Sequence, residues 1–161
     1  ACDLWAAPNG EVHILWTERA LDERLRAKFY PEAKQSHGLY YAVLREGRVL
    51  RRRTVAESTE DHPGISGSAG RFQPTPDNRL FIAYFASGTA PGGVGVSENR
   101  VTEVVAGGEL TPPVSLGLKH PMAGYFTAST RSGSMPSRWL EMLGPRSGSA
   151  QTISYAKVRL Y

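Results

Sequence analysis

The order of apolar and polar positions near the start of the chain predicts a β-hairpin. Val12, Ile14 and Trp16 occupy every second position after an Asn-Gly pair at 9–10. A period of two is typical of strands, because successive side chains point to opposite faces. An Asn-Gly pair tolerates the positive φ angles that tight hairpins require. We therefore interpret residues 3–17 as two strands joined by a turn.

The same pattern returns further along the chain, which indicates an internal repeat. Residues 71–85 align with residues 3–17, and the aligned pairs are Pro8 and Pro76, Asn9 and Asp77, Val12 and Leu80, Ile14 and Ile82, and Trp16 and Tyr84. Residues 42–50 align in the same way with residues 94–102, and in each segment a Glu precedes an Arg by two positions. We interpret each copy as two hairpins separated by a loop of variable length.

A repeated unit of four antiparallel strands is typical of a propeller blade. The sequence therefore predicts an all-β chain of about three antiparallel blades, a partial propeller, at residues 3–56, 69–118 and 125–161. The expected strands are 3–7, 11–17, 39–45 and 48–55, then 69–75, 79–86, 94–98 and 100–106 with an extended stretch at 114–118, then 125–128, 139–143 and 152–161. Because propellers have about four to eight blades, we expect the others to come from the same polypeptide or from a homo-oligomer. A β-sandwich is the alternative architecture.

The insertion at 17–36 differs from the rest of the chain in its period. Leu21, Leu25 and Phe29 recur every four residues, which is typical of the apolar stripe of a helix. Pro31 would end that helix, because proline lacks the backbone N–H that continues it. We expect one short helical insertion, packed over one rim of the sheets.

The charge of the chain favours anionic partners over nucleic acid. Nineteen Lys and Arg residues against 15 Asp and Glu residues give a net charge of +4, which attracts anions. The run Arg51-Arg52-Arg53 is basic, but strand alternation would place its middle member on the opposite face from the other two. Aromatic residues are poorly interleaved there, so we expect no nucleic-acid partner.

The cysteine and histidine positions predict neither a disulfide nor a metal site. Cys2 is the single cysteine, so no internal disulfide forms. No pair of Cys or His residues has the spacing of zinc ligands, and we expect no metal and no cofactor. No apolar stretch approaches about 18 residues, and the N-terminal residues lack the basic and apolar regions of a signal peptide. We therefore expect no membrane partner.

Three of the four histidines fall in connections that a propeller would place on one face. His37 ends the loop before the third strand, His62 lies in the connection into the second blade, and His120 lies in the connection into the third. Tyr41 follows His37 on the same predicted strand. Histidine and tyrosine both serve as proton donors and acceptors in enzymes, so this face is the expected site of chemistry.

Three further candidates begin the strands that would line the central channel. They are Asp3, Arg71 and Tyr125. A guanidinium beside the channel needs acceptors, and the carboxylate or sulfate of a ligand suits its planar fork of donors. Asp3 occupies the equivalent position one blade earlier, where it could pair with Arg71 or act as an acid.

Two stretches of the chain resemble sialidase-like, BNR-repeat propeller proteins. They are residues 70–84, GRFQPTPDNRLFIAY, and the closing pattern made by 126–128, 131–134 and 153–156. The Asp-box of that superfamily, Ser-x-Asp-x-Gly-x-x-Trp, is absent from this chain, and Arg71 alone could stand for the arginine triad of a sialidase. The mixture of His, Tyr and Arg is more similar to the propeller polysaccharide lyases.

The resemblance implies a carbohydrate-active protein that handles an anionic glycan, as a hydrolase or a polysaccharide lyase. Its partner would be an acidic oligo- or polysaccharide, and its location extracellular or periplasmic. The roles implied are catalytic for His37, His62 and Tyr41, and substrate-binding for Arg71, His120, Asp3 and Tyr125. The alternative is a non-catalytic binding or scaffolding propeller, with the insertion at 17–36 as its partner surface.

Overall fold

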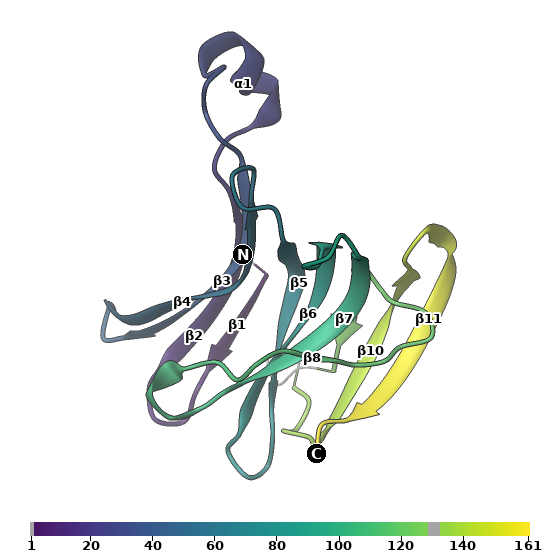
Figure 1. The fold of residues 1–161 in the computed structure, drawn as a ribbon. Helices are drawn as coiled ribbons and strands as arrows, with labels where there is room; N and C mark the ends of the chain where they lie inside the picture. Colours follow the sequence, from purple (N-terminus) through teal and green to yellow (C-terminus); the bar gives the residue numbers. More distant parts are fainter. Residues whose placement is uncertain (1, 129–132) are drawn as a thin grey trace.

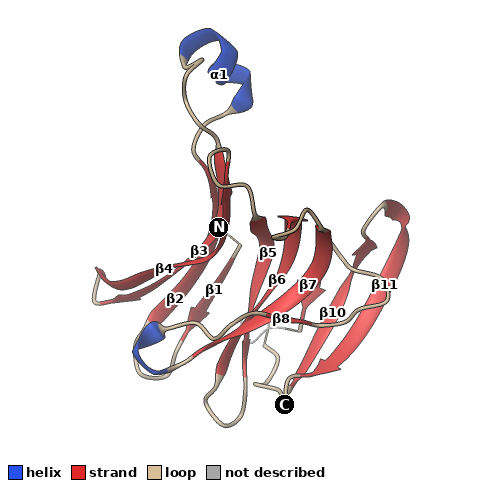
Figure 2. Ribbon diagram, in the orientation of Figure 1, coloured by secondary structure: helices blue, strands red, loops and turns tan. Residues whose placement is uncertain are grey.

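Three antiparallel β-sheets and one short helix make up the computed structural model, which describes residues 2–128 and 133–161 (Figures 1 and 2). The first sheet has the order β1 (Asp3–Ala6), β2 (Val12–Arg19), β3 (Ser36–Arg45), β4 (Arg48–Thr59). The second has the order β5 (Ile65–Pro74), β6 (Leu80–Thr89), β7 (Gly95–Val104), β8 (Val114–Ser115). The third has the order β11 (Ser149–Arg159), β10 (Trp139–Arg146), β9 (Phe126–Thr127). The all-β prediction is confirmed.

The β1–β2 and β5–β6 hairpins have the same register, which confirms the first repeat. Leu4 pairs with Ile14 as Phe72 pairs with Ile82, and Ala6 pairs with Val12 as Pro74 pairs with Leu80. The two turns match as well, since φ is +84° at Gly10 and +61° at Asn78, the equivalent position. Glycine and asparagine are the residues that adopt this left-handed backbone most readily.

The second predicted repeat, with a turn at Glu98 and Asn99 like that at Glu46 and Gly47, is wrong. β3 and β4 do turn at 46–47, but β7 runs without a break through Glu98 and Asn99. The Asn99 side chain is buried and exchanges two hydrogen bonds with the backbone of Met122, at 2.8 and 2.9 Å. Asn99 serves here to link β7 to the loop before β9 rather than to make a turn, and β8 supplies the fourth strand.

The second sheet is buried on both of its faces, because the other two sheets pack against it. On one side lie Leu15, Leu39, Tyr41 and Val43 of the first sheet against Phe72, Leu80, Ile82, Tyr84 and Ala86. On the other side lie Ala83, Met122, Tyr125, Leu140 and Met142. Successive sheets therefore stack face to face in chain order, as Figure 1 shows from purple through green to yellow.

The helix α1 (Glu23–Phe29) stands beyond the ends of β2 and β3 (Figure 1). Asp22 caps its first turn, and none of its residues is buried. Leu25 is exposed, so the expectation that the helix packs over the rim is wrong. Charged contacts hold it instead: Arg26 donates two hydrogen bonds to Glu60 after β4, at 2.6 and 2.7 Å.

The repeated hairpin makes a matched test of backbone conformation. Neither Gly10 nor Gly95 has an atom within 4 Å of an added Cβ, but only Gly10 has a positive φ. The variant Gly10→Ala should therefore lower the free energy of unfolding by about 1 to 2 kcal/mol, and Gly95→Ala should leave it unchanged or slightly raised. Urea unfolding measures both. Equal values for the two variants would contradict the assigned turn.

Candidate functional site

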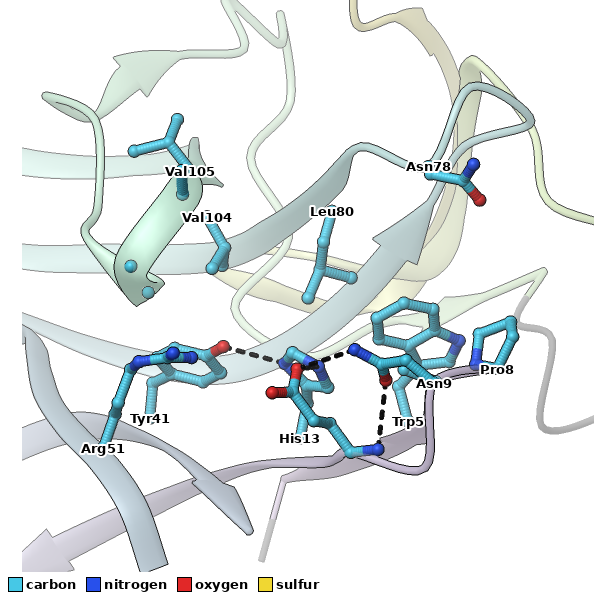
Figure 3. A pocket seen from close by; sticks show the side chains of 15 residues that line it. Trp5, Pro8, Asn9, His13, Tyr41, Arg51, Asn78, Leu80, Val104 and Val105 are labelled. Carbon is cyan, nitrogen blue, oxygen red and sulfur yellow. Dashed lines mark hydrogen bonds and ion pairs between the residues drawn. The ribbon is translucent and has the colours of Figure 1, made fainter. Parts of the chain in front are cut away.

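A pocket of about 450 Å³ opens between the first and second sheets, beside the two repeated turns (Figure 3). The first sheet lines it with Trp5, Glu11, His13, Tyr41 and Arg51, among others. The second sheet lines it with apolar side chains and with the 3₁₀ turn η1 (Ala106–Gly108). One wall is thus polar and titratable, and the opposite wall is largely apolar.

His13 is held in one orientation by its neighbours. Its Nδ1 lies 2.8 Å from the Tyr41 hydroxyl, and its Nε2 lies 3.8 Å from a carboxylate oxygen of Glu11. The Asn9 amide donates to the same carboxylate at 3.1 Å. The Trp5 ring lies against the imidazole with 4.9 Å between centroids. Figure 3 shows Trp5 of β1, His13 of β2 and Tyr41 of β3 side by side, with Asn9 of the turn next to them. The imidazole is therefore fixed between a phenol and a carboxylate.

Burial sets the charge of this group of residues. Burial lowers the pKa of His13; Glu11 opposes that effect and Arg51 reinforces it. Burial raises the pKa of Tyr41 well above its usual range, although Arg51 opposes the rise. At neutral pH the imidazole is therefore uncharged and the phenol keeps its proton. An uncharged imidazole keeps one nitrogen that can accept a proton.

The η1 turn lies against the Arg51 side chain at Gly108, where the absence of a Cβ leaves room for it. The φ angle of Gly108 is +73°, and a Cβ at this position would lie 2.7 Å from the Arg51 Cδ atom. Two residues further along β4, Arg53 forms an ion pair with Glu109, just after the turn. The same side of β4 thus carries both contacts to the second sheet, while Arg52 faces the other way against Trp16. The alternation predicted for the basic run is confirmed.

The structure separates Tyr41 from the histidines predicted to act with it. Tyr41 is fully buried, and its hydroxyl is hydrogen-bonded to His13. His37 lies four residues away on the same strand, which is about 13 Å, and burial together with Arg19 lowers its pKa. His62 is exposed at that end of the sheet, where its backbone N–H donates to the Thr59 hydroxyl at 2.9 Å. His37 and His62 therefore share a rim that Tyr41 does not reach.

His120 lies apart from both groups. It lines a small pocket near the third sheet with Met122 and Tyr155. Its Nδ1 atom is buried and has no hydrogen-bond partner among residues 2–128 and 133–161. Arg131, part of the pattern behind the family resemblance, lies outside the described residues.

The three residues predicted to line a channel do come together where the three sheets meet. The buried Asp3 carboxylate accepts a hydrogen bond from the Phe72 backbone at 2.9 Å. The Arg71 guanidinium donates to the carbonyl of Cys2 at 2.9 Å and lies 5.9 Å from the centre of the Tyr125 ring. Burial raises the pKa of Tyr125, and Arg71 opposes the rise. This cluster joins β1 and β5 to Tyr125, the residue that precedes β9.

Apart from Tyr41, sequence reasoning missed the residues that form the main pocket, although the repeat contains a signal for His13. Trp5 pairs with His13 across the first hairpin, and Gln73 pairs with Phe81 at the equivalent place in the second. A histidine thus stands where the other copy has phenylalanine. Where one copy of a repeat has a titratable residue and the other an apolar one, the titratable residue is a candidate for a function specific to its own copy.

Comparisons of the chain with protein-family models, with curated proteins and with solved structures give no match. No helix in the described part of the chain is long and apolar enough to cross a membrane. The described residues contain no group of three or more His, Cys, Asp and Glu side chains that could hold a metal ion. The interpretation of the pocket therefore depends on its own geometry.

The lowered pKa of His13 should make the fold sensitive to acid. Above the ordinary histidine value of 6.5 the ring is neutral in both states, whereas below it the unfolded chain binds a proton that the folded chain does not. The free energy of unfolding should therefore fall as the pH drops through and below that value. In His13→Gln this part of the fall should disappear, which urea unfolding between about pH 7 and pH 5 measures.

The control for this experiment is His62→Gln, which removes an exposed histidine from a loop. The fall in stability that is assigned to His13 should persist in this variant, because His13 is intact. If this fall also persists in His13→Gln, the interpretation of His13 as a buried neutral group is wrong.

Proposed function

We propose that this chain forms blades of a sialidase-like β-propeller and binds an acidic saccharide in the pocket between its first and second sheets. The observation that carries the proposal is the state of Arg51. Its neighbours Arg52 and Arg53 form ion pairs with Glu18 and Glu109. Among the described residues, none forms an ion pair or a hydrogen bond with the Arg51 guanidinium, although this residue lines the pocket.

An unpaired arginine in a partly enclosed pocket is suited to a carboxylate or a sulfate. Its planar fork binds such a group through two parallel hydrogen bonds. Because the opposite wall is largely apolar and the Trp5 indole lies beside His13, the C–H face of a sugar ring could pack against an aromatic surface while its acidic group binds Arg51. The net charge of +4 would favour the approach of such a ligand.

The stacking of the three sheets supports the propeller over the sandwich. A β-sandwich has two sheets, each with one buried face, whereas here the second sheet is covered on both. The first strands of the three sheets also converge, where Asp3 bonds to β5 and Arg71 lies on Tyr125. Sheets arranged radially around their first strands are the architecture of a propeller.

A second candidate function, favoured by the uncharged His13 beside Arg51, is cleavage of the same saccharide by a lyase reaction. Arg51 would neutralise a uronate carboxylate, and His13 would take the proton from the neighbouring C5. The C4–O bond would break as the C4–C5 double bond forms, and the leaving oxygen would take a proton from water. Most glycoside hydrolases use two carboxylates about 5 to 9.5 Å apart, and Glu11 is the one carboxylate among the described residues of the pocket.

In this scheme the role of Tyr41 differs from the catalytic one expected from the sequence. The phenol is fully buried and bonded to His13, so it would orient the imidazole and would not reach the substrate. His37 and His62 lie outside the pocket. The exposed Leu25 and Phe29 of α1 support the other alternative, a scaffolding role in which this helix contacts a protein partner.

The binding proposal predicts a selective effect of Arg51→Gln. A hydrogen-bonded charge contributes about 1.5 to 3 kcal/mol, so the Kd of a galacturonate trisaccharide should rise at least about tenfold. Binding of the neutral galactose trisaccharide should not change. Isothermal titration calorimetry measures both, and no binding of the acidic probe by the wild type would sink the proposal.

The η1 turn offers a matched control for the same experiment. Gly107 and Gly108 both have positive φ, but only a Cβ at Gly108 meets Arg51. Both Gly107→Ala and Gly108→Ala strain the backbone, so their stabilities should fall by similar amounts. Only Gly108→Ala should also weaken binding of the acidic probe, because it displaces the Arg51 side chain.

The lyase candidate predicts a new ultraviolet absorbance from the unsaturated uronate when the wild type is incubated with polygalacturonate. His13→Gln should abolish this absorbance while it leaves the Kd of the trisaccharide within a few-fold, because the base acts only on the reacting proton. An equal rate in the variant would exclude His13 as the base.

A further inference from the structure

An apolar surface lies open on the side of the third sheet that faces away from the second. Along β10, Leu140 and Met142 are buried against the second sheet, and Leu143 points the other way. Leu143 pairs with Phe126 on β9 and with Tyr155 on β11, and all three are exposed. With the exposed Ile153, these residues form a surface that we call the third-sheet face (Phe126, Leu143, Ile153 and Tyr155).

A second apolar surface lies on the opposite side of the molecule. Leu15 points from β2 into the core, so its neighbours Ile14 and Trp16 point away from it. We call this surface the first-sheet face (Leu4, Val12, Ile14 and Trp16). Leu4 is paired with Ile14, and the Trp16 ring stacks on Tyr40 at 5.7 Å between centroids. These positions are half-buried or exposed, since no sheet in the described part of the chain covers them.

The internal repeat indicates what the first-sheet face is built to contact. The equivalents of Leu4, Val12, Ile14 and Trp16 in the second hairpin are Phe72, Leu80, Ile82 and Tyr84. All four of those residues are buried against the first sheet. The first-sheet face therefore carries apolar or aromatic residues at the same four register positions as a surface that receives a neighbouring sheet within this chain.

We propose that the third-sheet face of one copy of this chain docks on the first-sheet face of a second copy. A second copy is the occupant that fits, because each copy carries both halves of the contact and the contact would continue the face-to-face stacking of the first two interfaces. The interface is heterologous, since different surfaces meet. Two copies would bring together six sheets, a number within the range of closed propellers.

This docking surface is distinct from the saccharide pocket. None of the residues of the two faces lines that pocket. Failure of the docking therefore leaves the proposed binding of a saccharide intact, and the reverse also holds.

Light scattering after size exclusion, at a chain concentration of about 100 μM, tests the proposal. The wild type should have twice the 17.6 kDa mass of one chain. Leu4→Lys and Leu143→Lys, at side chains 43% and 49% exposed, should each have the mass of one chain. Leu25→Lys on α1, at a side chain 45% exposed but on neither face, should keep the doubled mass. A wild type of 17.6 kDa overturns the proposal.

Mixing the two variants gives a sharper test. Leu4→Lys keeps an intact third-sheet face and Leu143→Lys keeps an intact first-sheet face, so an equimolar mixture should regain the doubled mass. If the contact joined two identical faces, only one of the two variants would lose the doubled mass. That result overturns the proposal, and so does an equimolar mixture that keeps the mass of one chain. Circular dichroism checks that each variant folds, and Tyr155→Lys, at a side chain 61% exposed, replaces Leu143→Lys if that variant does not.

Discussion

The burial of β6 between two other sheets is the constraint on which the rest of the structure depends. Leu80, Ile82 and Tyr84 pack against the first sheet, while Ala83 packs against the third. A strand that is buried on both faces is stabilised by apolar residues at every position. In β6 every residue from Leu80 to Ala86 is apolar or aromatic and buried. The small side chain of Ala83 leaves room for Leu140 and Met142 of the third sheet.

The same core places the pocket and supplies its stiffness. Three titratable groups of the pocket stand on strands, because His13 comes from β2, Tyr41 from β3 and Arg51 from β4, and Glu11 lies in the short turn before β2. Strands that are fixed by a packed core hold side chains more closely than loops do. The approaching wall is a short turn, and it is joined to β4 by the ion pair between Arg53 and Glu109.

The sequence predicted those features that depend on local backbone chemistry. The period of two with an Asn-Gly turn located the first hairpin and its repeat. Asp3, Arg71 and Tyr125 were grouped as strand starts and do lie together, although β5 begins at Ile65, six residues before Arg71. Features that depend on what covers a surface were not predictable in this way. An apolar stripe on a helix does not show which surface, if any, covers it. The sequence therefore predicted that α1 packs over a rim of the sheets, whereas Leu25 of this helix is exposed.

The catalytic candidates were grouped by their expected loops, and this grouping ignores where a residue lies along a strand. β3 has 10 residues, which span about 33 Å. His37 at its start therefore lies at the rim of the sheet, and Tyr41 further along lies in the pocket. The hydrogen bond between Tyr41 and His13 depends on the register of β2 with β3. Register is set by the packing of all three sheets and is not written in any single motif.

The glycine at position 108 joins two requirements in one residue. It must allow a left-handed backbone, and it must leave empty the space that the stem of Arg51 fills. Gly107, its neighbour, meets the first requirement only. Over evolutionary time position 107 can therefore accept asparagine, which tolerates such a backbone, whereas a side chain at 108 must either displace the stem of Arg51 or be matched by a smaller residue at 51. Positions 51 and 108 should vary together among related chains, although they belong to different sheets.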